Sequence, residues 1–447
     1  MLTQEQCREI HDTVERLARA AGVRDVETHV GSHVESLTRF ANNIIHQNVA
    51  ERGRWLSVRV QLGQKTGRVT TNRFEEAAIQ SAVDQALALA KAAEPNPDLL
   101  PLAEPETIAA VSRCYNATAD ATPEQRASGV TEAIRLVESA GQTAAGIYST
   151  EHDAYGLFNS RGLAAYHAET MARFSITVMA EDSSGWAKIS STDRDRIVPV
   201  ELARRASQKA SASKTPDELP PGKYPVILEP AAVLDLVGQI FGDFSATAIN
   251  DKRSFLTDRL GQPLFGTNIN IDDDVYHPMQ SGSPFDGEGV SRKRLKLVEA
   301  GVPREIAYSR ANAHKAGVAP TGHGFALPNE IGEMPMNIVI QGGDTSLDKM
   351  IASTERGILV TRLWYIREVD PYEKIMTGMT RDGTFLVEAG EIVRGLRNFR
   401  FNQSVVELLK NVESLSPAVR ASGEEAFDMV VPAIKAHEFN FTEVTRF

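Results

Sequence analysis

The spacing of apolar residues near the start of the chain predicts a helix followed by a group of strands. Val14, Leu17 and Ala21 recur at helical spacing among polar side chains. Thr3, with a glutamine three positions later, provides a capping box for this helix. Short strands are expected at 26–30 and 36–40, and a hairpin of strands 55–62 and 67–71 across the turn 63–66.

Three further helices are predicted in the same half. Asn72 opens an alanine-rich helix that runs to about residue 93. Thr122, followed by Pro123, opens another helix that stops before Gly141. The third covers about residues 200–213.

A proline-rich segment at 215–225 interrupts this pattern and predicts a linker between two domains, 1–214 and 226–447. The second domain begins with a strand at 226–228 and a helix at 231–249, and then consists of short strands separated by glycine turns. The strands expected there are 337–341, 358–366, 385–387 and 392–393, with a helix at 346–355. The predicted fold is α+β, with an N-terminal domain of helices and hairpins and a C-terminal domain of mostly antiparallel β-structure.

Composition narrows the classes of function without naming one. A chain of 447 residues exceeds what one hydrophobic core organises, in agreement with two domains. The formal net charge of -11 disfavours binding to phosphate backbones and to anionic lipid surfaces, so we expect no nucleic-acid partner. The longest basic run, Arg292–Arg294 with Lys296, alternates with apolar residues, as on the solvated side of a strand.

Cysteine usage and the lack of long apolar segments predict a cytoplasmic protein without a membrane partner. Only Cys7 and Cys114 are present, so neither a disulfide framework nor a multi-cysteine metal site is expected. No uncharged apolar run approaches the roughly 20 residues that span a bilayer. The first segment is an amphipathic helix rather than a secretory signal.

Histidines and acidic runs offer little for a metal site. His29 and His33 have the spacing of two ligands on a helix, but the surrounding alternation favours a strand, in which four residues span roughly 13 Å. We therefore expect solvated or turn histidines. Asp272–Asp274, followed by His277, lacks the ligand pattern of a calcium loop and is predicted to be a solvated acidic turn.

Paired glutamates are weak candidates for acid–base work. Glu330 and Glu333 form one pair, and Glu388 and Glu391 form another across a predicted tight turn. Neither pair has a nucleophile or a histidine nearby in sequence. The chain also lacks the nucleophile-elbow, phosphate-loop and dinucleotide motifs. Spacing alone therefore names no reaction.

A series of short segments in a fixed order resembles the TldD/PmbA family from Tyr224 to the C-terminus, and the first 220 residues look like the N-terminal domain of that family. The segments that carry the resemblance are Tyr224–Leu228, Ser254–Leu256, Ser283–Val290, Pro320–Gly324, Arg356–Thr361, Val387–Ile392 and Leu409–Val412. Ser283–Val290, which reads SPFDGEGV, is the most specific of them.

The resemblance implies an emptied zinc site. Active TldD-type members carry HExxxH on the helix after the first C-terminal strand and a cysteine near the C-terminus. Aligned by eye on Pro230, Gly238 and Asp243 replace the two histidines, Gln239 replaces the glutamate, and Ser422 lies near the cysteine position. Glycine has no donor atom, and serine binds zinc far less well than thiolate. No metal is therefore expected in this chain. Alternatively, 238–243 is a helix-packing segment without any role in a site.

The function that the resemblance implies is a non-catalytic TldE/PmbA-type subunit of a heteromeric zinc metalloprotease acting on short and unfolded peptides. Zinc would belong to a TldD-type partner, and a homodimer is expected when that partner is missing. Asp286 and Glu288 are candidate peptide contacts, although 283–290 also suits a plain turn. The family's label as a modulator of DNA gyrase implies no contact with DNA.

Two other functions stay open at this stage. One is a stand-alone peptidase or hydrolase using another metal constellation, such as Asp243, Asp272–Asp274, His277 or His323. The other is a peptide carrier or maturation factor that works without a protease partner.

Overall fold

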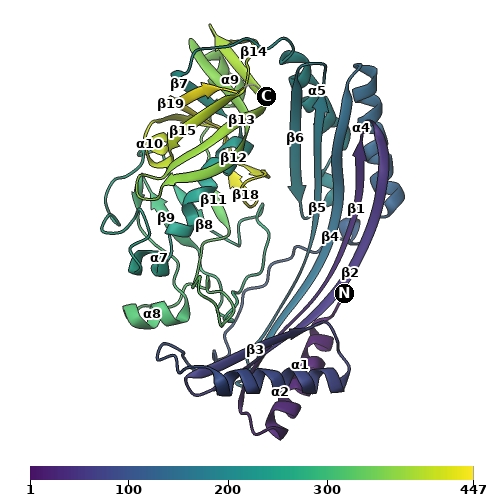
Figure 1. The fold of residues 1–447 in the computed structure, drawn as a ribbon, viewed down its shortest axis with the longest axis vertical. Coiled ribbons are helices and arrows are strands. Elements are labelled where there is room, and N and C mark those ends of the chain that lie inside the picture. The colour runs from purple at the N-terminus through teal and green to yellow at the C-terminus, as the bar shows by residue number, and fades with distance from the viewer. Residues whose placement is uncertain (446–447) are drawn as a thin grey trace.

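One long, curved antiparallel sheet forms the N-terminal half of the protein (Figure 1). The computed structural model describes residues 1–445. Strand order in this sheet is β3-β2-β1-β4-β5-β6. The strands are β1 (Asp25–Ala41), β2 (Ile44–Leu62), β3 (Lys65–Thr71), β4 (Thr143–Asn159), β5 (Ala164–Met179) and β6 (Ser184–Ser191).

The two short strands expected at 26–30 and 36–40 are parts of β1, so that prediction was wrong about their separation. Gly31 does not interrupt the strand. It lies opposite Trp55 of β2, and glycine leaves room for the indole, since a Cβ at this position would be 2.4 Å from that ring. The expected hairpin of β2 and β3 is confirmed. Leu62 pairs with Lys65, and Gly63 has the positive φ of 62° that a tight turn requires.

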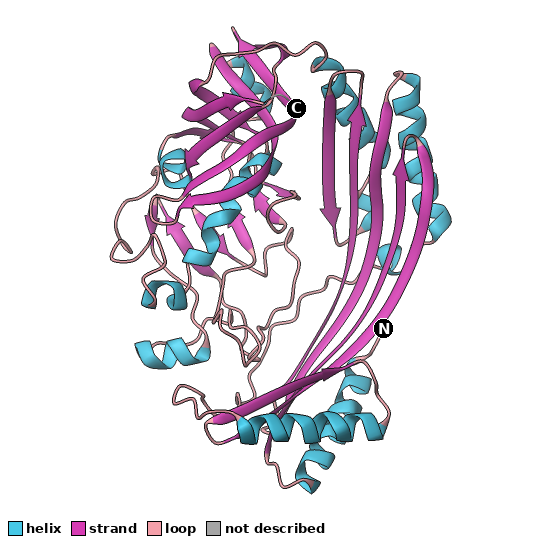
Figure 2. Ribbon diagram, viewed as in Figure 1, coloured by secondary structure: helices cyan, strands magenta, loops and turns pink. Residues whose placement is uncertain are grey.

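Helices cover the outer face of this sheet at both ends (Figures 1 and 2). They are α1 (Gln4–Ala20) and α2 (Glu76–Ala92) at one end, α4 (Pro123–Ser139) and α5 (Pro199–Ala212) at the other, and the short α3 (Asn116–Ala119) between them. The capping box of Thr3 and the helix start at Thr122 are confirmed, and Thr122 also forms a capping box, with Gln125. Asn72 does not cap α2, which begins four residues later and has Glu75 at its N-cap without a side-chain bond.

A glycine on each outer strand lets a helix backbone touch the sheet. A Cβ at Gly67 of β3 would lie 2.4 Å from the Ala86 carbonyl oxygen of α2. A Cβ at Gly185 of β6 would lie 2.1 Å from the Ala206 carbonyl oxygen of α5. At both ends of the sheet, a glycine on the edge strand therefore allows a helix backbone to pack closely against that strand.

The C-terminal half contains two smaller sheets around the largest hydrophobic core of the described residues. In the first sheet, an additional pairing of β12 with β13 closes β12, β7, β19, β15 and β13 into a ring. Its strands are β7 (Gly222–Leu228), β12 (Arg356–Asp370), β13 (Ile375–Glu388), β14 (Glu391–Gly395), β15 (Phe399–Ser404), β16 (Val412–Leu415) and β19 (Ile434–Val444).

The second sheet has the order β10-β9-β8-β11-β18-β17. Its strands are β8 (Ile271–Asp273), β9 (Leu295–Glu299), β10 (Val302–Pro303), β11 (Ile338–Ile340), β17 (Val419–Ala421) and β18 (Met429–Val431). Most pairings are antiparallel, with β7–β12 and β11–β18 as parallel ones. The protein therefore has the predicted α+β fold.

The single helix expected at 231–249 is divided into three pieces. They are α6 (Pro230–Val237), the 3₁₀ helix η2 (Gly238–Asp243) and α7 (Ala246–Asn250). Two glycines in the middle piece disfavour a continuous α-helix, and Ser245 caps the last piece through a bond from the Ala248 N–H. The other C-terminal helices are α8 (Arg310–Ala316), α9 (Leu347–Ala352) and α10 (Val405–Lys410).

The acidic run Asp272–Asp274 is not the solvated turn that was predicted, because its first two residues lie in β8 and are buried. The Asp273 carboxylate accepts hydrogen bonds from the Met336 and Asn337 N–H groups at 2.6 and 2.9 Å. Arg294 donates to Asp272 at 2.9 Å. Backbone donors and one guanidinium compensate these carboxylates, which composition alone does not reveal.

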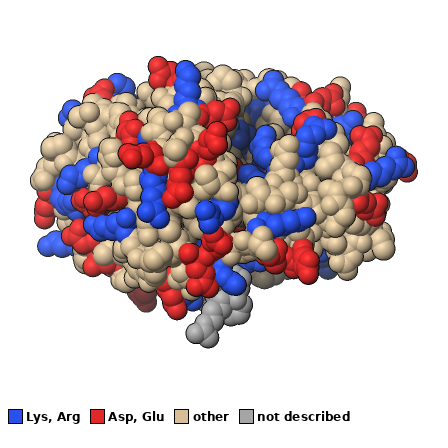
Figure 3. Space-filling model, turned by 90° about the horizontal axis from the view of Figure 1, so that it is seen from above, with Lys and Arg blue, Asp and Glu red and all other residues tan. Residues whose placement is uncertain are grey.

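Charge is distributed over the visible surface without a large area of one sign. Figure 3 shows basic and acidic side chains interspersed on both halves of the molecule seen from above. No helix within the described residues is long and apolar enough to cross a membrane.

Candidate functional site

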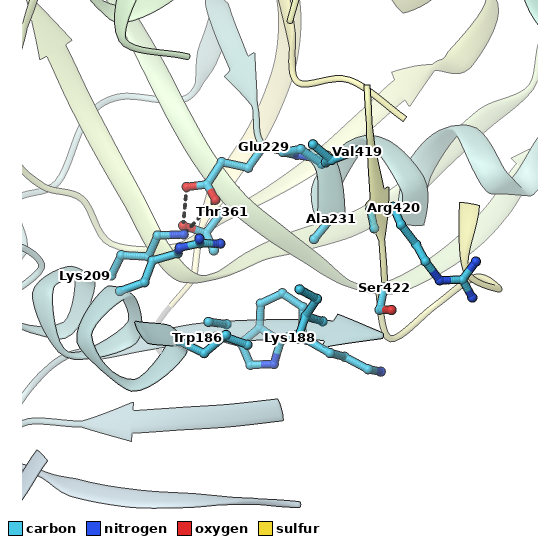
Figure 4. Close-up of a pocket in the computed structure, with 15 residues that line it drawn as sticks. Trp186, Lys188, Lys209, Glu229, Ala231, Thr361, Val419, Arg420 and Ser422 are labelled. Atoms are coloured by element: carbon cyan, nitrogen blue, oxygen red, sulfur yellow. Dashed lines mark hydrogen bonds and ion pairs between the residues drawn. The ribbon is translucent and has the colours of Figure 1, made fainter. Parts of the chain in front are cut away.

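A cavity of about 240 Å³ lies where the long sheet meets the C-terminal domain (Figure 4). β6 and α5 form one wall, and the first turn of α6 with β12 and β17 forms the other. The lining residues are Trp186, Ala187, Lys188, Ile189, Leu202, Arg205, Lys209, Glu229, Pro230, Ala231, Thr361, Val419, Arg420, Ala421 and Ser422.

Ion pairs and hydrogen bonds across this cavity tie the two domains together. Lys209 Nζ of α5 lies 2.7 Å from Glu229 Oε2, at the N-cap of α6. Thr361 Oγ1 donates to the other oxygen of Glu229 at 3.3 Å. Lys188 Nζ donates to the Gly423 carbonyl oxygen at 2.6 Å. These contacts fix the walls relative to each other.

Arg420 is the most heavily bonded cation of the lining. Its guanidinium donates to Ser190 Oγ at 2.8 Å, the Met279 carbonyl oxygen at 2.9 Å and Asp428 Oδ2 at 3.1 Å. Ser422 Oγ donates to Ser190 Oγ at 2.8 Å. Because its donors are satisfied within the protein, Arg420 holds the wall and is not free to bind a ligand anion.

The hydroxyl groups of the lining are hydrogen-bonded within the protein. Ser422 Oγ donates to Ser190 Oγ, and hydrogen bonds from both serines help to lower the pKa of Asp428 against the effect of burial, after the larger effects of Arg420 and Arg173. Neither histidine nor cysteine contributes to the residues that line the cavity. Cationic and apolar side chains make up most of the remaining lining.

The four positions matched to the family's zinc motif each have contacts within the protein. Ser422 lines the cavity, and three residues further on the Glu425 N–H donates to Asp235 of α6 at 2.9 Å. Gln239 donates to the Asp235 and Glu425 carbonyl oxygens. Asp243 lies 2.7 Å from Lys374 Nζ. The alignment of 238–243 with the motif stays a prediction.

The side chains at these positions do not fit a zinc ion. A Cβ at Gly238 would already be 2.6 Å from Ala426 Cβ, so this position has no room for an imidazole without rearrangement. Asp243 is committed to Lys374 and to the Phe255 N–H. Among the described residues, no three His, Cys, Asp or Glu side chains converge as a metal ligand set would.

Asp286 and Glu288 hold their own loop. Asp286 is 2% exposed and accepts bonds from the Glu288, Val290 and Gly324 N–H groups. Glu288 is 5% exposed, accepts a bond from the Arg310 N–H, and has its pKa raised to about 8 by burial and by the neighbouring Asp286 carboxylate. A peptide contact through these side chains stays a prediction, because both carboxylates point into the protein here.

His29 is buried, so the expectation of a solvated or turn histidine was wrong for this residue. It lies in β1, as the predicted extended conformation requires, with Nε2 3.0 Å from Glu27 Oε1 and Nδ1 2.8 Å from the Tyr155 hydroxyl. Tyr155 in turn stacks on Phe285 of the 283–290 loop at 5.5 Å. The histidine thus belongs to the junction between the domains.

Two other candidate groups are also structural. His323 Nε2 lies 3.1 Å from Asp273 Oδ1, and both side chains are 0% exposed, which closes the pair to a substrate. Glu333 accepts bonds from the Thr247 and Ser309 N–H groups at 2.7 and 3.0 Å and so fixes the starts of two short helices. Neither group works as an accessible acid or base in this arrangement.

A carboxylate cluster on the inward face of the long sheet escaped the sequence analysis. Asp153, Glu151 and Glu169 lie close enough that burial first, and then the two glutamates, raise the pKa of Asp153 to about 6. Arg173 pairs with Glu151. These residues alternate along β4 and β5, and that alternation was the only signal in the sequence, because the pairing of the two strands decides which side chains meet.

A curved antiparallel sheet joined to a ring of strands, with a cavity between them, defines an α+β scaffold. Domain models of one family match this scaffold in order along the chain. The PmbA/TldA metallopeptidase domain 1 matches residues 31–90, the central domain 72–214 and the C-terminal domain 221–443. The chain therefore belongs to the PmbA/TldD metallopeptidase family.

Individual relatives agree with this assignment. A metalloprotease of Methanothermobacter thermautotrophicus is 26% identical over 282 residues, which cover 59% of this chain and 60% of that protein, less than two thirds of its length. A metalloprotease PmbA homolog of Haemophilus influenzae is 24% identical over 371 residues, covering 80% of this chain and 79% of that protein. The crystal structure of TldE from Thermococcus kodakarensis has a TM-score of 0.89 at 20% identity and covers 97% of this chain and 100% of that chain, which establishes a common fold.

Proposed function

We propose that this chain is the non-catalytic, TldE-type subunit of a heteromeric zinc metalloprotease, and that it shapes the chamber in which short or unfolded peptides are cleaved. The observation that carries the proposal is a family scaffold retained from residue 31 to 443, in which the described residues form no group of three His, Cys, Asp or Glu side chains that could hold a metal ion. In this proposal, zinc and the glutamate base belong to a TldD-type partner.

The interdomain contacts support a scaffolding role. Ser184 of β6 donates to Asp382 of β13 at 2.6 Å, and Arg113 donates to the Gly282 carbonyl oxygen at 2.7 Å. Together with the Lys209–Glu229 pair, they join the long sheet to the C-terminal domain at several points. A subunit without catalytic groups contributes to a shared chamber through its shape, and a rigid frame keeps that shape fixed.

A group of exposed side chains at the far end of β12 offers anchors for the partner. Tyr365, Val369 and Tyr372 are 53%, 58% and 56% exposed. The Arg367 guanidinium lies over the Tyr365 ring at 4.4 Å. Tyrosine and arginine are the residues most enriched at the energetic centres of protein interfaces. The proposed occupant of this surface is the TldD-type subunit, or a second copy of this chain when that subunit is absent, because two subunits of one fold present similar patches.

Co-expression with a TldD-type homologue that carries HExxxH tests the proposal. The expected result is co-elution of both chains, zinc only in the partner by elemental analysis, and digestion of unfolded casein that requires both chains. A Tyr365→Ser, Val369→Ser variant should elute separately from the partner, with Ile392→Ser, at another exposed apolar side chain, as the matched control. Full activity of the partner alone, unchanged in rate and elution by this chain, would contradict the proposal.

The stand-alone hydrolase is the less favoured alternative. Its candidate ligands do not converge: Asp243 is paired with Lys374, the His323–Asp273 pair is closed to solvent, and His277 Nδ1 accepts the Met279 N–H at 3.2 Å. Near-equimolar zinc that survives mild chelation of the purified chain, and is lost in a His277→Ala variant, would favour this alternative.

A further inference from the structure

A second cleft, of about 770 Å³, lies on the outer face of the long sheet, away from the interdomain cavity. Its lining brings together β1, β2, β4 and the segment that leads into α3. Cys114 precedes α3 and His152 lies in the middle of β4, and both line this cleft. Cys114 Sγ is 3.4 Å from His152 Nε2. The fold therefore pairs a thiol with an imidazole.

The thiol is accessible and its backbone is held in place. Cys114 is exposed, whereas Cys7 is buried in the core. On either side of Cys114, the Thr170 N–H donates to the Arg113 carbonyl oxygen and the Tyr115 N–H donates to Thr170 Oγ1, both at 3.0 Å. These bonds hold the segment against β5, so the approach of the thiol to His152 is a built feature and not a loose contact.

Two guanidinium groups flank the pair. Val34 of β1 lies opposite both Arg52 of β2 and His152 of β4, so these side chains stand on the same face of the sheet. Arg54, two residues from Arg52, shares that face, and both arginines line the cleft and are exposed. The lining contains one carboxylate, Asp120. Local charge therefore favours an anionic ligand.

We propose that Cys114 and His152 form a thiol-modification site for small anionic disulfides of the glutathione disulfide class. In the reaction, Cys114 Sγ attacks one sulfur of the disulfide, a new S–S bond forms, and the original S–S bond breaks. The Cys114 proton passes to His152 Nε2 and then to the departing thiolate. One protein thiol is oxidised to a mixed disulfide, and one molecule of small thiol is released for each disulfide consumed.

The protonation states suit proton transfer through the imidazole. Burial, followed by the Asp120 carboxylate, raises the pKa of Cys114, and burial lowers the pKa of His152. At neutral pH the pair is thus a thiol and a neutral imidazole, and the charged groups of the surrounding lining are Asp120, Arg52, Arg54 and the N-terminal ammonium of Met1. A neutral imidazole at this distance can serve as a general base.

The purified full chain, incubated with three disulfides of different charge, tests the proposal by intact-mass spectrometry. Glutathione disulfide is anionic, hydroxyethyl disulfide is neutral and cystamine is cationic. We expect one adduct, at Cys114, formed fastest with glutathione disulfide. Cys7 is the internal control, because burial raises the pKa of its thiol to about 11 and leaves it inaccessible. A Cys114→Ser variant should gain no adduct.

Two variants separate the contributions of base and charge. His152→Gln should slow adduct formation about tenfold or more at neutral pH with all three disulfides, and the difference should shrink above the pKa of the thiol. Arg52→Gln with Arg54→Gln should slow only the reaction with glutathione disulfide. If His152→Gln unfolds the chain, the order of the wild-type reaction rates with the anionic, neutral and cationic disulfides still tests the proposal. Equal rates with all three disulfides, or preferential reaction of Cys7, would overturn the proposal, and neither result depends on a peptidase partner.

Discussion

Arg59 Nη2 donates to Glu27 Oε2 at 2.7 Å between two adjacent strands, with the two side chains 3% and 2% exposed. Arg68 Nη2 donates to the same carboxylate at 2.6 Å, and Arg68 Nε donates to the Leu327 carbonyl oxygen of the C-terminal domain. A buried carboxylate thus organises two guanidinium groups at the domain junction. In such a network the removal of one member leaves an uncompensated buried charge, which costs more than the intact pair contributes.

Replacement of Glu27 by Gln should therefore destabilise the protein by about 3 kcal/mol in the free energy of unfolding. Urea denaturation followed by circular dichroism measures this loss. Glu35→Gln, on the same strand and with a partly exposed side chain, is the control and should change little. A loss for Glu27→Gln no larger than that of the control would show that the guanidinium groups find other compensation.

The same carboxylate predicts acid sensitivity. Burial alone would raise the pKa of Glu27, but Arg59 and the hydrogen bond from His29 outweigh it and hold the pKa well below its ordinary value of 4.5. A depressed carboxyl pKa stabilises the fold above the ordinary value and loses that effect as pH falls through the folded-state pKa. Stability of the wild-type protein should therefore fall below about pH 4, and more steeply than that of Glu27→Gln.

Asp235 predicts a pH dependence of the opposite sign. Its Oδ1 accepts the Glu424 and Glu425 N–H groups at 3.0 and 2.9 Å, while burial, the largest effect, raises its pKa to about 7. A carboxyl group whose pKa is raised by folding does not lower the stability of the fold below its ordinary pKa of 3.8, because it is then protonated in both the folded and the unfolded state. Above that pH the loss of stability grows until the pH passes about 7.

An Asp235→Asn variant should remove this penalty. It should match the wild-type protein at about pH 4 and be more stable by about 1–2 kcal/mol at about pH 8, because the amide oxygen can still accept both backbone bonds. Thermal unfolding at the two pH values checks the difference. A variant that is less stable than wild type at both would indicate that the ionised form is the one the fold requires.

Gly185 tests the close contact between β6 and α5. Because a Cβ there would meet the Ala206 carbonyl oxygen at 2.1 Å, Gly185→Ala should force α5 away from the sheet and cost about 3 kcal/mol. Gly222→Ala is a matched control, since its Cβ would meet no atom closer than 3.5 Å. Thermal denaturation of both variants measures the contrast, and similar melting temperatures would mean that α5 shifts at little cost.

The sequence predicted those parts of the fold that are fixed by neighbouring residues. Both capping boxes lie within four residues of chain. The turn between Glu388 and Glu391 is also confirmed, because Ala389 and Gly390 adopt the positive φ values of 50° and 84° that a two-residue hairpin turn needs. In each case the local sequence contains all the information that the structure uses.

The buried polar groups could not be predicted in the same way. The sequence around Asp273 predicts a solvated acidic run. In the structure, β8 lies beside the chain at Asn337, whose N–H donates to the Asp273 carboxylate. Cys114 and His152 are 38 residues apart, and their contact depends on where α3 docks on β4. Strand register and docking decide which charges are neutralised, and neither is contained in a local pattern.

Restoring the aligned motif should not create a peptidase. The variant combining Gly238→His, Gln239→Glu and Asp243→His would place an imidazole against Ala426 and would remove the carboxylate that lies 2.7 Å from the buried Lys374 ammonium. It also lacks a thiolate and the oriented partners that tune a catalytic zinc. We expect no zinc-dependent digestion of casein and a lower melting temperature. Robust digestion abolished by chelation and restored by zinc would contradict this expectation.

The last prediction concerns the Lys209–Glu229 ion pair across the interdomain cavity. The two side chains are 14% and 15% exposed, with their charged atoms 2.7 Å apart, so solvent screens them only in part. They belong to different domains. Removal of either side chain leaves the charge of the other partly buried and without its partner.

A double-mutant cycle of Lys209→Met and Glu229→Gln measures their coupling in the free energy of unfolding. Each single variant should be destabilised by about 1–2 kcal/mol, and the double variant by less than the sum, with a coupling energy of about 1 kcal/mol. Lys223 and Glu438, an exposed pair at 3.0 Å, form the control cycle and should show weaker coupling. Limited proteolysis within residues 215–221, the part of the expected linker that precedes β7, adds a second measurement, because loss of the ion pair should speed cleavage there. Additive single variants with unchanged proteolysis would mean that the cavity walls are held by the remaining contacts alone.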